Sequence, residues 1–91
     1  MEGFLIKNKM KEIYLKGYWA EEDLWIYQHY QDQYAVRQIN VYPDESQYFT
    51  VENPGLGKDG LGDQPLDALD TSMVEFISKE EFEKNWSKQA K

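Results

Sequence analysis

The first half of the chain alternates between apolar and polar positions. Between Lys11 and Trp19, apolar side chains fall at every second position, and tyrosine or lysine occupies the positions between them. A period of two residues predicts a β-strand. Similar patterns predict three further strands, at 24–30, 34–42 and 47–51. Because the breaks between these segments are short and polar, we expect the four strands to form an antiparallel meander.

The third predicted strand changes parity in its middle. Tyr34 and Val36 occupy even positions, whereas Ile39 and Val41 occupy odd ones. One extra residue in a strand swaps the faces of everything that follows it. The pattern therefore predicts a β-bulge near Arg37.

The end of the chain predicts a helix from about 79 to 89. Ser78 precedes Glu81 by three residues, which is the spacing of a capping box. Phe82 and Trp86 are four residues apart and therefore share one helical face. We expect this face to be buried against the sheet.

The segment between the last predicted strand and this helix is less regular. Residues 52–64 contain four of the six glycines and are predicted to form a loop. Three of these glycines match the pattern G-x-G-x-x-G, but the surroundings are not a strand-to-helix unit, and Asp59 and Asp63 would repel a pyrophosphate. No cofactor is therefore predicted. Residues 65–69 predict a helical turn, and residues 73–77 an extended or irregular segment.

These patterns together predict an α+β fold: a twisted four-stranded antiparallel sheet with a C-terminal helix packed on one face. Ninety-one residues suffice for one modest core. We expect residues 1–9 to form an N-terminal arm and residues 10–91 a single domain. The chain has no cysteine, so its stability must come from packing, for which its fourteen aromatic residues are suited. With no visible targeting segment, this composition predicts a cytoplasmic protein.

The negative charge is concentrated in the middle of the chain. Residues 17–78 carry twelve carboxylates against two basic side chains, a net charge of −10, whereas the whole chain carries −7. Such a segment repels nucleic acid and anionic membranes, so neither is an expected partner, and it favours a basic protein. The alternative is that the carboxylates only keep a small domain soluble.

The two faces of the predicted sheet both carry apolar side chains. If the face with Ile13, Leu15, Trp19, Leu24 and Ile26 packs against the helix, the tyrosines and Trp25 lie on the opposite face. One helix cannot cover both faces, so either the loop 52–77 covers the second face or that face binds a partner. The candidate partner-binding residues are Tyr14, Tyr18, Trp25, Tyr27, Asp59, Asp63 and Asp67.

Candidate catalytic and metal-binding residues are few. His29 is the only histidine, so a zinc site of histidine and cysteine is not expected. Beside Asp32 it fits a general base, but no nucleophile or oxyanion hole accompanies it, which favours a structural strand histidine. Arg37 suits either anion binding or pairing with a carboxylate of the acidic segment. The acidic residues of 59–70 lack the spacing of a calcium-binding loop. No metal site and no enzymatic activity are predicted.

Four sequence blocks resemble a family of small, largely uncharacterised bacterial domains. The resemblance covers about 11–86, and it departs from the family at Glu45 and Ser46, where a glycine is usual. It implies a sheet with a C-terminal helix but no accepted activity or catalytic residues. The blocks are Lys16–Trp19, Tyr34–Tyr42 leading to the turn at Asp44, Leu61–Leu66 and Ile77–Trp86.

By analogy, small acidic bacterial proteins of this kind often occur as antitoxins or immunity proteins beside toxins, although a fold does not determine a function. The sequence therefore predicts a protein-binding module, most concretely an immunity protein that neutralises a basic toxin, such as a nuclease, through an acidic and aromatic surface. The alternative is an accessory interaction domain or homodimer with no toxin partner.

Overall fold

A computed structural model describes residues 11–56 and 59–88 of this chain. The predicted N-terminal arm, 1–9, lies outside the described residues. The fold is α+β, with an antiparallel sheet of five strands in the order β4-β3-β2-β1-β7. Its strands are β1 (Glu12–Trp19), β2 (Leu24–Gln31), β3 (Tyr34–Val41), β4 (Ser46–Thr50) and β7 (Val74–Phe76).

The antiparallel meander of β1 to β4 is confirmed, but the prediction of only four strands is wrong. Strand β7 pairs with the outer edge of β1, where Leu15 lies opposite Phe76 and Gly17 opposite Val74. Its three residues are too few for a periodic pattern to identify, because a strand this short acquires its conformation by pairing with a longer neighbour.

Short elements occupy the segment predicted to be a loop and a helical turn. A small two-stranded ladder pairs β5 (Gly55–Leu56) with β6 (Asp59–Gly60). Two 3₁₀ turns follow, η1 (Leu66–Ala68) and η2 (Thr71–Met73). The helical turn predicted at 65–69 is therefore confirmed as η1.

The C-terminal helix α2 (Lys79–Trp86) begins at the predicted cap. The hydroxyl of Ser78 accepts a hydrogen bond from the backbone N–H of Glu81 at 3.0 Å, which satisfies one of the free donors of the first turn. The carboxylate of Glu81 is bonded to the ammonium of Lys16 on the sheet at 3.1 Å. The cap thus begins the helix and also ties it to β1. The helix ends at Trp86, with Ser87 as its C-cap, so it is shorter than the predicted helix of about 79–89.

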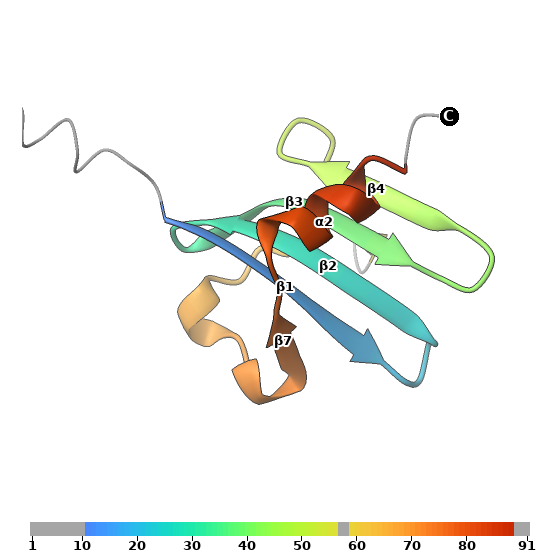
Figure 1. The fold of residues 1–91 in the computed structure, drawn as a ribbon, viewed down its shortest axis with the longest axis horizontal. Helices are drawn as coiled ribbons and strands as arrows, with labels where there is room; N and C mark the ends of the chain where they lie inside the picture. The colour runs from blue at the N-terminus through green and yellow to red at the C-terminus, as the bar shows by residue number, and fades with distance from the viewer. Residues whose placement is uncertain (1–10, 57–58, 89–91) are drawn as a thin grey trace, which may run out of the picture.

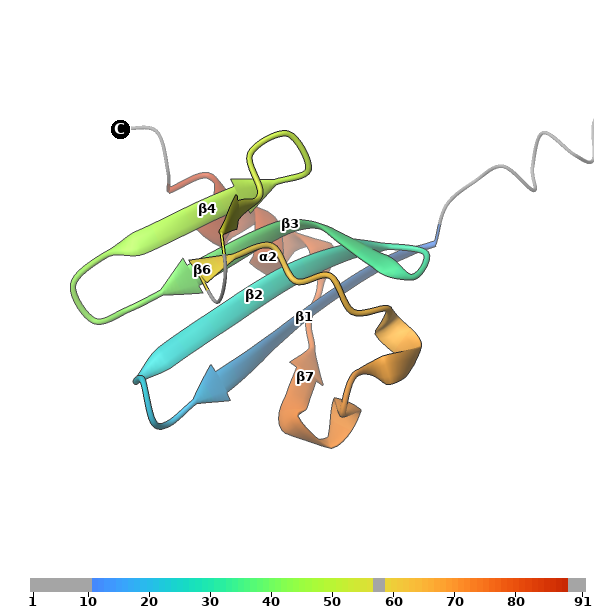
Figure 2. The same ribbon diagram turned by 180° about the vertical axis from the view of Figure 1, so that it is seen from behind.

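The sheet has a layer on each side. Helix α2 lies across one face (Figure 1), and the segment 59–73 runs across the other (Figure 2). On the helix side, the buried core is formed by Tyr14, Ile39 and Phe82. On the loop side, three buried residues of the sheet contact leucines of the covering segment, and these residues are Leu15, Tyr30 and Ala35 below and Leu61, Leu66 and Leu69 above.

The predicted assignment of the two faces is wrong. The helix covers the face of Tyr14 and Tyr27, whereas Leu15 and Leu24 lie on the face that does not carry the helix. Alternation separates the two faces of a strand, but it does not rank them when both carry apolar side chains. The long segment between β4 and β7 does cover one face, which was one of the two alternatives, but that face is the aliphatic one.

A bulge interrupts the pairing of β2 with β3, as predicted. His29 lies opposite Arg37 and Tyr30 lies opposite Ala35, so Val36 is the additional residue. The extra residue reverses the faces along β3. As a result, Arg37 lies on the helix side of the sheet although Ala35, two residues earlier, is buried on the loop side.

Among the described residues, no helix is both long and apolar enough to cross a membrane.

Candidate functional site

Two of the predicted partner-binding residues are covered by the helix. Tyr14 is 8% exposed and stacks on His29, with 4.4 Å between the ring centroids. The ring of Phe82 lies 5.5 Å from that of Tyr14 and 5.8 Å from that of His29, so the three rings pack against one another. Tyr27 is half-buried and packs against the same core cluster. Tyr14 therefore belongs to the core, and it is not part of an accessible surface.

Tyr18 and Trp25, in contrast, are exposed at the end of the sheet where β1 turns into β2. They lie opposite each other in the β1–β2 register, and their ring centroids are 5.0 Å apart. The Tyr18 hydroxyl donates a 2.7 Å hydrogen bond to the carboxylate of Asp23, which raises the pKa of Tyr18. The Lys16 ammonium lies 5.3 Å from the centre of the Trp25 ring, a cation–π contact. Both rings are thus held in place before any partner binds.

The turn between β1 and β2 adds three carboxylates beside these rings. Glu21, Glu22 and Asp23 are all exposed, and the turn is closed by the backbone N–H of Glu22 donating to Trp19. Asp23 has a φ of 52°, a left-handed conformation that aspartate and asparagine tolerate better than most residues. We call this region the hairpin tip, and its residues are Tyr18, Trp19, Glu21, Glu22, Asp23 and Trp25.

Trp19 was not among the predicted site residues, because it was assigned to the face beneath the helix. Its side chain is 49% exposed. The sequence feature that could have identified Trp19 as a site residue is its position as the last residue before a charged turn. A strand end extends beyond the covering layer, so a large apolar side chain there remains accessible on either face.

The three predicted aspartates lie outside the hairpin tip, on the elements that follow β5. Asp59 begins strand β6, and Asp63 and Asp67 are exposed on the segment that crosses the loop side. The backbone N–H of Asp67 donates to the side chain of Gln33, in the turn between β2 and β3. This turn and the hairpin tip lie at opposite ends of β2 (Figure 2). The structure therefore divides the predicted site between two regions.

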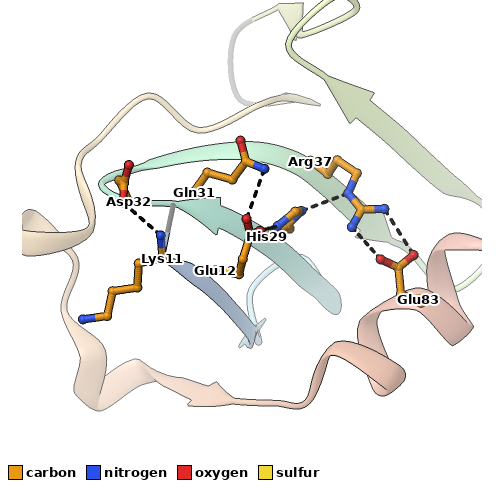
Figure 3. Close-up of polar contacts among 7 residues, drawn as sticks. All are labelled: Lys11, Glu12, His29, Gln31, Asp32, Arg37 and Glu83. Atoms are coloured by element: carbon orange, nitrogen blue, oxygen red, sulfur yellow. Dashed lines mark hydrogen bonds and ion pairs between the residues drawn. The ribbon is translucent and has the colours of Figure 1, made fainter. Parts of the chain in front are cut away.

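Beneath the helix, four charged or ionisable side chains form a continuous chain of contacts (Figure 3). Nε2 of His29 contacts the Glu12 carboxylate at 2.5 Å, and Nδ1 accepts a 3.0 Å hydrogen bond from Nε of Arg37. Since Nδ1 accepts, the ring proton is on Nε2. Arg37 binds the carboxylate of Glu83 through both terminal nitrogens, at 3.2 and 2.7 Å. This chain links β1, β2, β3 and α2.

The environment of these four side chains explains the pKa shifts of His29 and Glu83. Burial lowers the pKa of His29, although the contact with Glu12 opposes this effect. The hydrogen bonds from Arg37 lower the pKa of Glu83. The guanidinium also lies over the rings of Phe82 and Trp86, 4.8 and 5.0 Å from their centres.

His29 has the surroundings expected of a structural strand histidine, because its ring stacks on Tyr14 and its polar partners do not include Asp32. The neighbours of His29 are Glu12 and Arg37, whereas the carboxylate of Asp32 accepts from the backbone N–H of Lys11. Arg37 pairs with Glu83 of the helix, outside the acidic segment. With both ring nitrogens engaged and 6% of its surface exposed, His29 connects secondary-structure elements. Neither partner was identifiable, because nothing local in the sequence relates residue 37 to residue 83.

No group of three or more histidine, aspartate or glutamate side chains within 11–56 and 59–88 is arranged to hold a metal ion. Comparisons with protein-family models, with curated proteins and with solved structures found no match to this chain.

Proposed function

We propose that this domain is a protein-binding module for a basic partner, most concretely an immunity protein or antitoxin that acts in the bacterial cytoplasm. In this role it covers the nucleic-acid-binding surface of a basic toxin, such as a nuclease, and carries out no catalytic step itself. The observation that supports the proposal is the hairpin tip, where three exposed aromatic rings adjoin three exposed carboxylates.

The aromatic rings of the tip suit an interface. Tyrosine and tryptophan are enriched where binding energy is concentrated, because they bury a large area and lose little conformational entropy. Tyr18 is already fixed by its hydrogen bond to Asp23, and Trp25 by the Tyr18 ring and Lys16. Such preorganisation reduces the entropic cost of binding.

The carboxylates of the tip supply the complementary charge. A chain with a net charge of −7 attracts a basic protein over a distance of about 8–10 Å at physiological salt. This attraction accelerates association and disfavours acidic partners, whereas the aromatic contacts govern dissociation. The two contributions are therefore separable by experiment.

The test uses the purified chain and the purified products of the neighbouring genes in the source genome. We expect one basic product to bind, and the substitution Trp25→Ala to weaken its equilibrium affinity by about 30-fold or more, as for a hot-spot residue of about 2 kcal/mol. Tyr34→Ala is the matched control, because Tyr34 is 56% exposed but lies at the other end of the sheet. It should leave the affinity unchanged.

A second variant tests the charge. Replacing Glu21 and Glu22 by glutamine and Asp23 by asparagine retains the shape of the turn, since asparagine tolerates the conformation of Asp23. The association rate should fall and its dependence on salt should flatten. The proposal is wrong if no basic product binds, or if Trp25→Ala and Tyr34→Ala have the same effect.

A further inference from the structure

The loop side of the sheet contains an open groove of about 800 Å³. The sheet contributes Ile26 and the glutamines Gln28 and Gln38 to its floor, and Leu69 and Val74 form part of its walls. Tyr18 and Trp19 of the hairpin tip also line the groove, so the two regions adjoin each other. Volumes of about 300–1,000 Å³ are typical of ligand sites.

One wall of the groove is held by the side-chain amide of Gln38, which is 3% exposed. Its oxygen accepts hydrogen bonds from the backbone N–H of Gly62 and from Gln28, both at 2.9 Å. Its nitrogen donates to the carbonyl of Gly60 and to Asn40, also at 2.9 Å. Because the hydrogen bonds of this amide are satisfied by residues of the sheet and of the loop, it fixes the loop at a set height above the sheet.

The opposite wall depends on close packing at Gly17. A Cβ atom at this position would lie 3.3 Å from Cγ1 of Val74 and 3.4 Å from the carbonyl oxygen of Met73. Glycine therefore permits β7 and the turn before it to approach β1 closely. With both walls fixed, the groove exists before any ligand binds.

The charge of the groove indicates what it binds. Among the described residues that line it, the charged side chains are Asp63 and Asp70, and none is basic. Asp63 is exposed and makes no hydrogen bond or ion pair with any other described residue. Asp70 already accepts from Ser72, which lowers its pKa and keeps it ionised. The ligand that fits is a cation on an aliphatic stem.

We propose that the groove receives an arginine side chain from an extended segment of the basic partner, an inference that rests on the proposed function. The methylene stem packs on Ile26 and Val74, and the guanidinium pairs with Asp63. Arginine meets both requirements, since its methylene groups pack on apolar surface and its planar cation binds carboxylates through two nitrogens. The shared residues Tyr18 and Trp19 make the groove and the hairpin tip one continuous binding surface.

The test titrates the isotope-labelled chain with capped Leu-Arg dipeptide and follows the backbone amide resonances by NMR. We expect shifts at Gly17, Gly62 and Leu69, which line the groove, and unchanged resonances at Tyr34. The neutral isostere Leu-citrulline should bind about fivefold more weakly or worse, which corresponds to about 1 kcal/mol for a partly exposed ion pair.

Two variants with the same change of charge complete the test. Asp63→Lys should weaken dipeptide binding by at least the same factor, whereas Asp67→Lys should not, because Asp67 is exposed on the same segment but does not line the groove. Equal binding of the arginine and citrulline dipeptides, or equal effects of the two variants, overturns the inference.

The same variants distinguish this inference from the proposed function. If the basic partner binds and depends on Trp25 but not on Asp63, the groove inference is wrong and the proposed function stands. If no basic partner binds while the dipeptide occupies the groove as expected, the proposed function is wrong, and the arginine site is supported on its own.

Discussion

Removing the side chain of Phe82 should detach the C-terminal helix. Phe82 is fully buried, and its ring lies 5.5 Å from that of Tyr14, 5.8 Å from that of His29 and 5.9 Å from that of Trp86. Helix α2 has only eight residues. Since isolated helices shorter than about 12–15 residues are marginal in water, α2 depends on this packing.

The expected magnitude follows from the burial. Phe→Ala at a fully buried position destabilises proteins by about 3–5 kcal/mol, and the lost contact with the Arg37 guanidinium favours the upper part of this range. A domain of this size has a total stability of roughly 5–14 kcal/mol. Phe82→Ala should therefore remove a large fraction of the free energy of unfolding.

The assay is urea denaturation followed by tryptophan fluorescence and far-ultraviolet circular dichroism. Phe76→Ala is the matched control, because Phe76 is 57% exposed on β7 and its loss should change the stability by about 0.5 kcal/mol or less. If the helix detaches in the native state of Phe82→Ala, the slope of the unfolding free energy against urea should also fall, since less surface remains to be exposed. A loss below about 1 kcal/mol for Phe82→Ala would refute the view that this residue anchors the helix.

Two further predictions concern the helix cap and pH. Ser78→Ala should lower the free energy of unfolding by about 1 kcal/mol, because the N–H of Glu81 loses its acceptor; Ser87→Ala at the other end, measured in the same urea titration, should have a smaller effect. The pKa of His29 is lower in the folded state than its ordinary value of 6.5, so the unfolded chain binds the proton more tightly. The stability that depends on neutral His29 should thus be fully present above pH 6.5 and decline as the pH falls below 6.5. The pKa of Glu83 is also lower than its ordinary value of 4.5 in the folded state, so a further decline in stability should follow below pH 4.5. Urea midpoints between about pH 7.5 and 5.5 should show the first decline in the wild type and a smaller one in His29→Gln; identical curves would contradict this assignment.

Local features of the chain could be predicted from the sequence. The four strands of the meander, the bulge beside Arg37 and the cap at Ser78 all follow from residues within four positions of one another. Backbone geometry sets these periods directly, because side chains alternate along a strand and residues three or four apart share a helical face.

The candidate site could be predicted only in part. Tyr18 and Trp25 were identified as accessible aromatics, and both are exposed. Tyr14 lies on the same face of β1 as Tyr18. Tyr14 is nevertheless in the core, because α2 covers only the part of this face that contains Tyr14. Alternation specifies the face of a residue, but which part of the face is covered depends on where a distant element docks.

Only the tertiary structure determines which face of the sheet packs against the helix and which charged side chains pair with each other. Arg37 and Glu83 are separated by 46 positions, and Glu12 and His29 by 17. Both faces of the sheet are apolar enough to be buried, so the periodic pattern leaves two packings open. On the helix side, Arg37 pairs with Glu83 and its guanidinium lies over Phe82 and Trp86, whereas the aliphatic face packs against the leucines of the loop. The choice between the two faces thus comes from complementarity between elements remote in sequence, which no local pattern encodes.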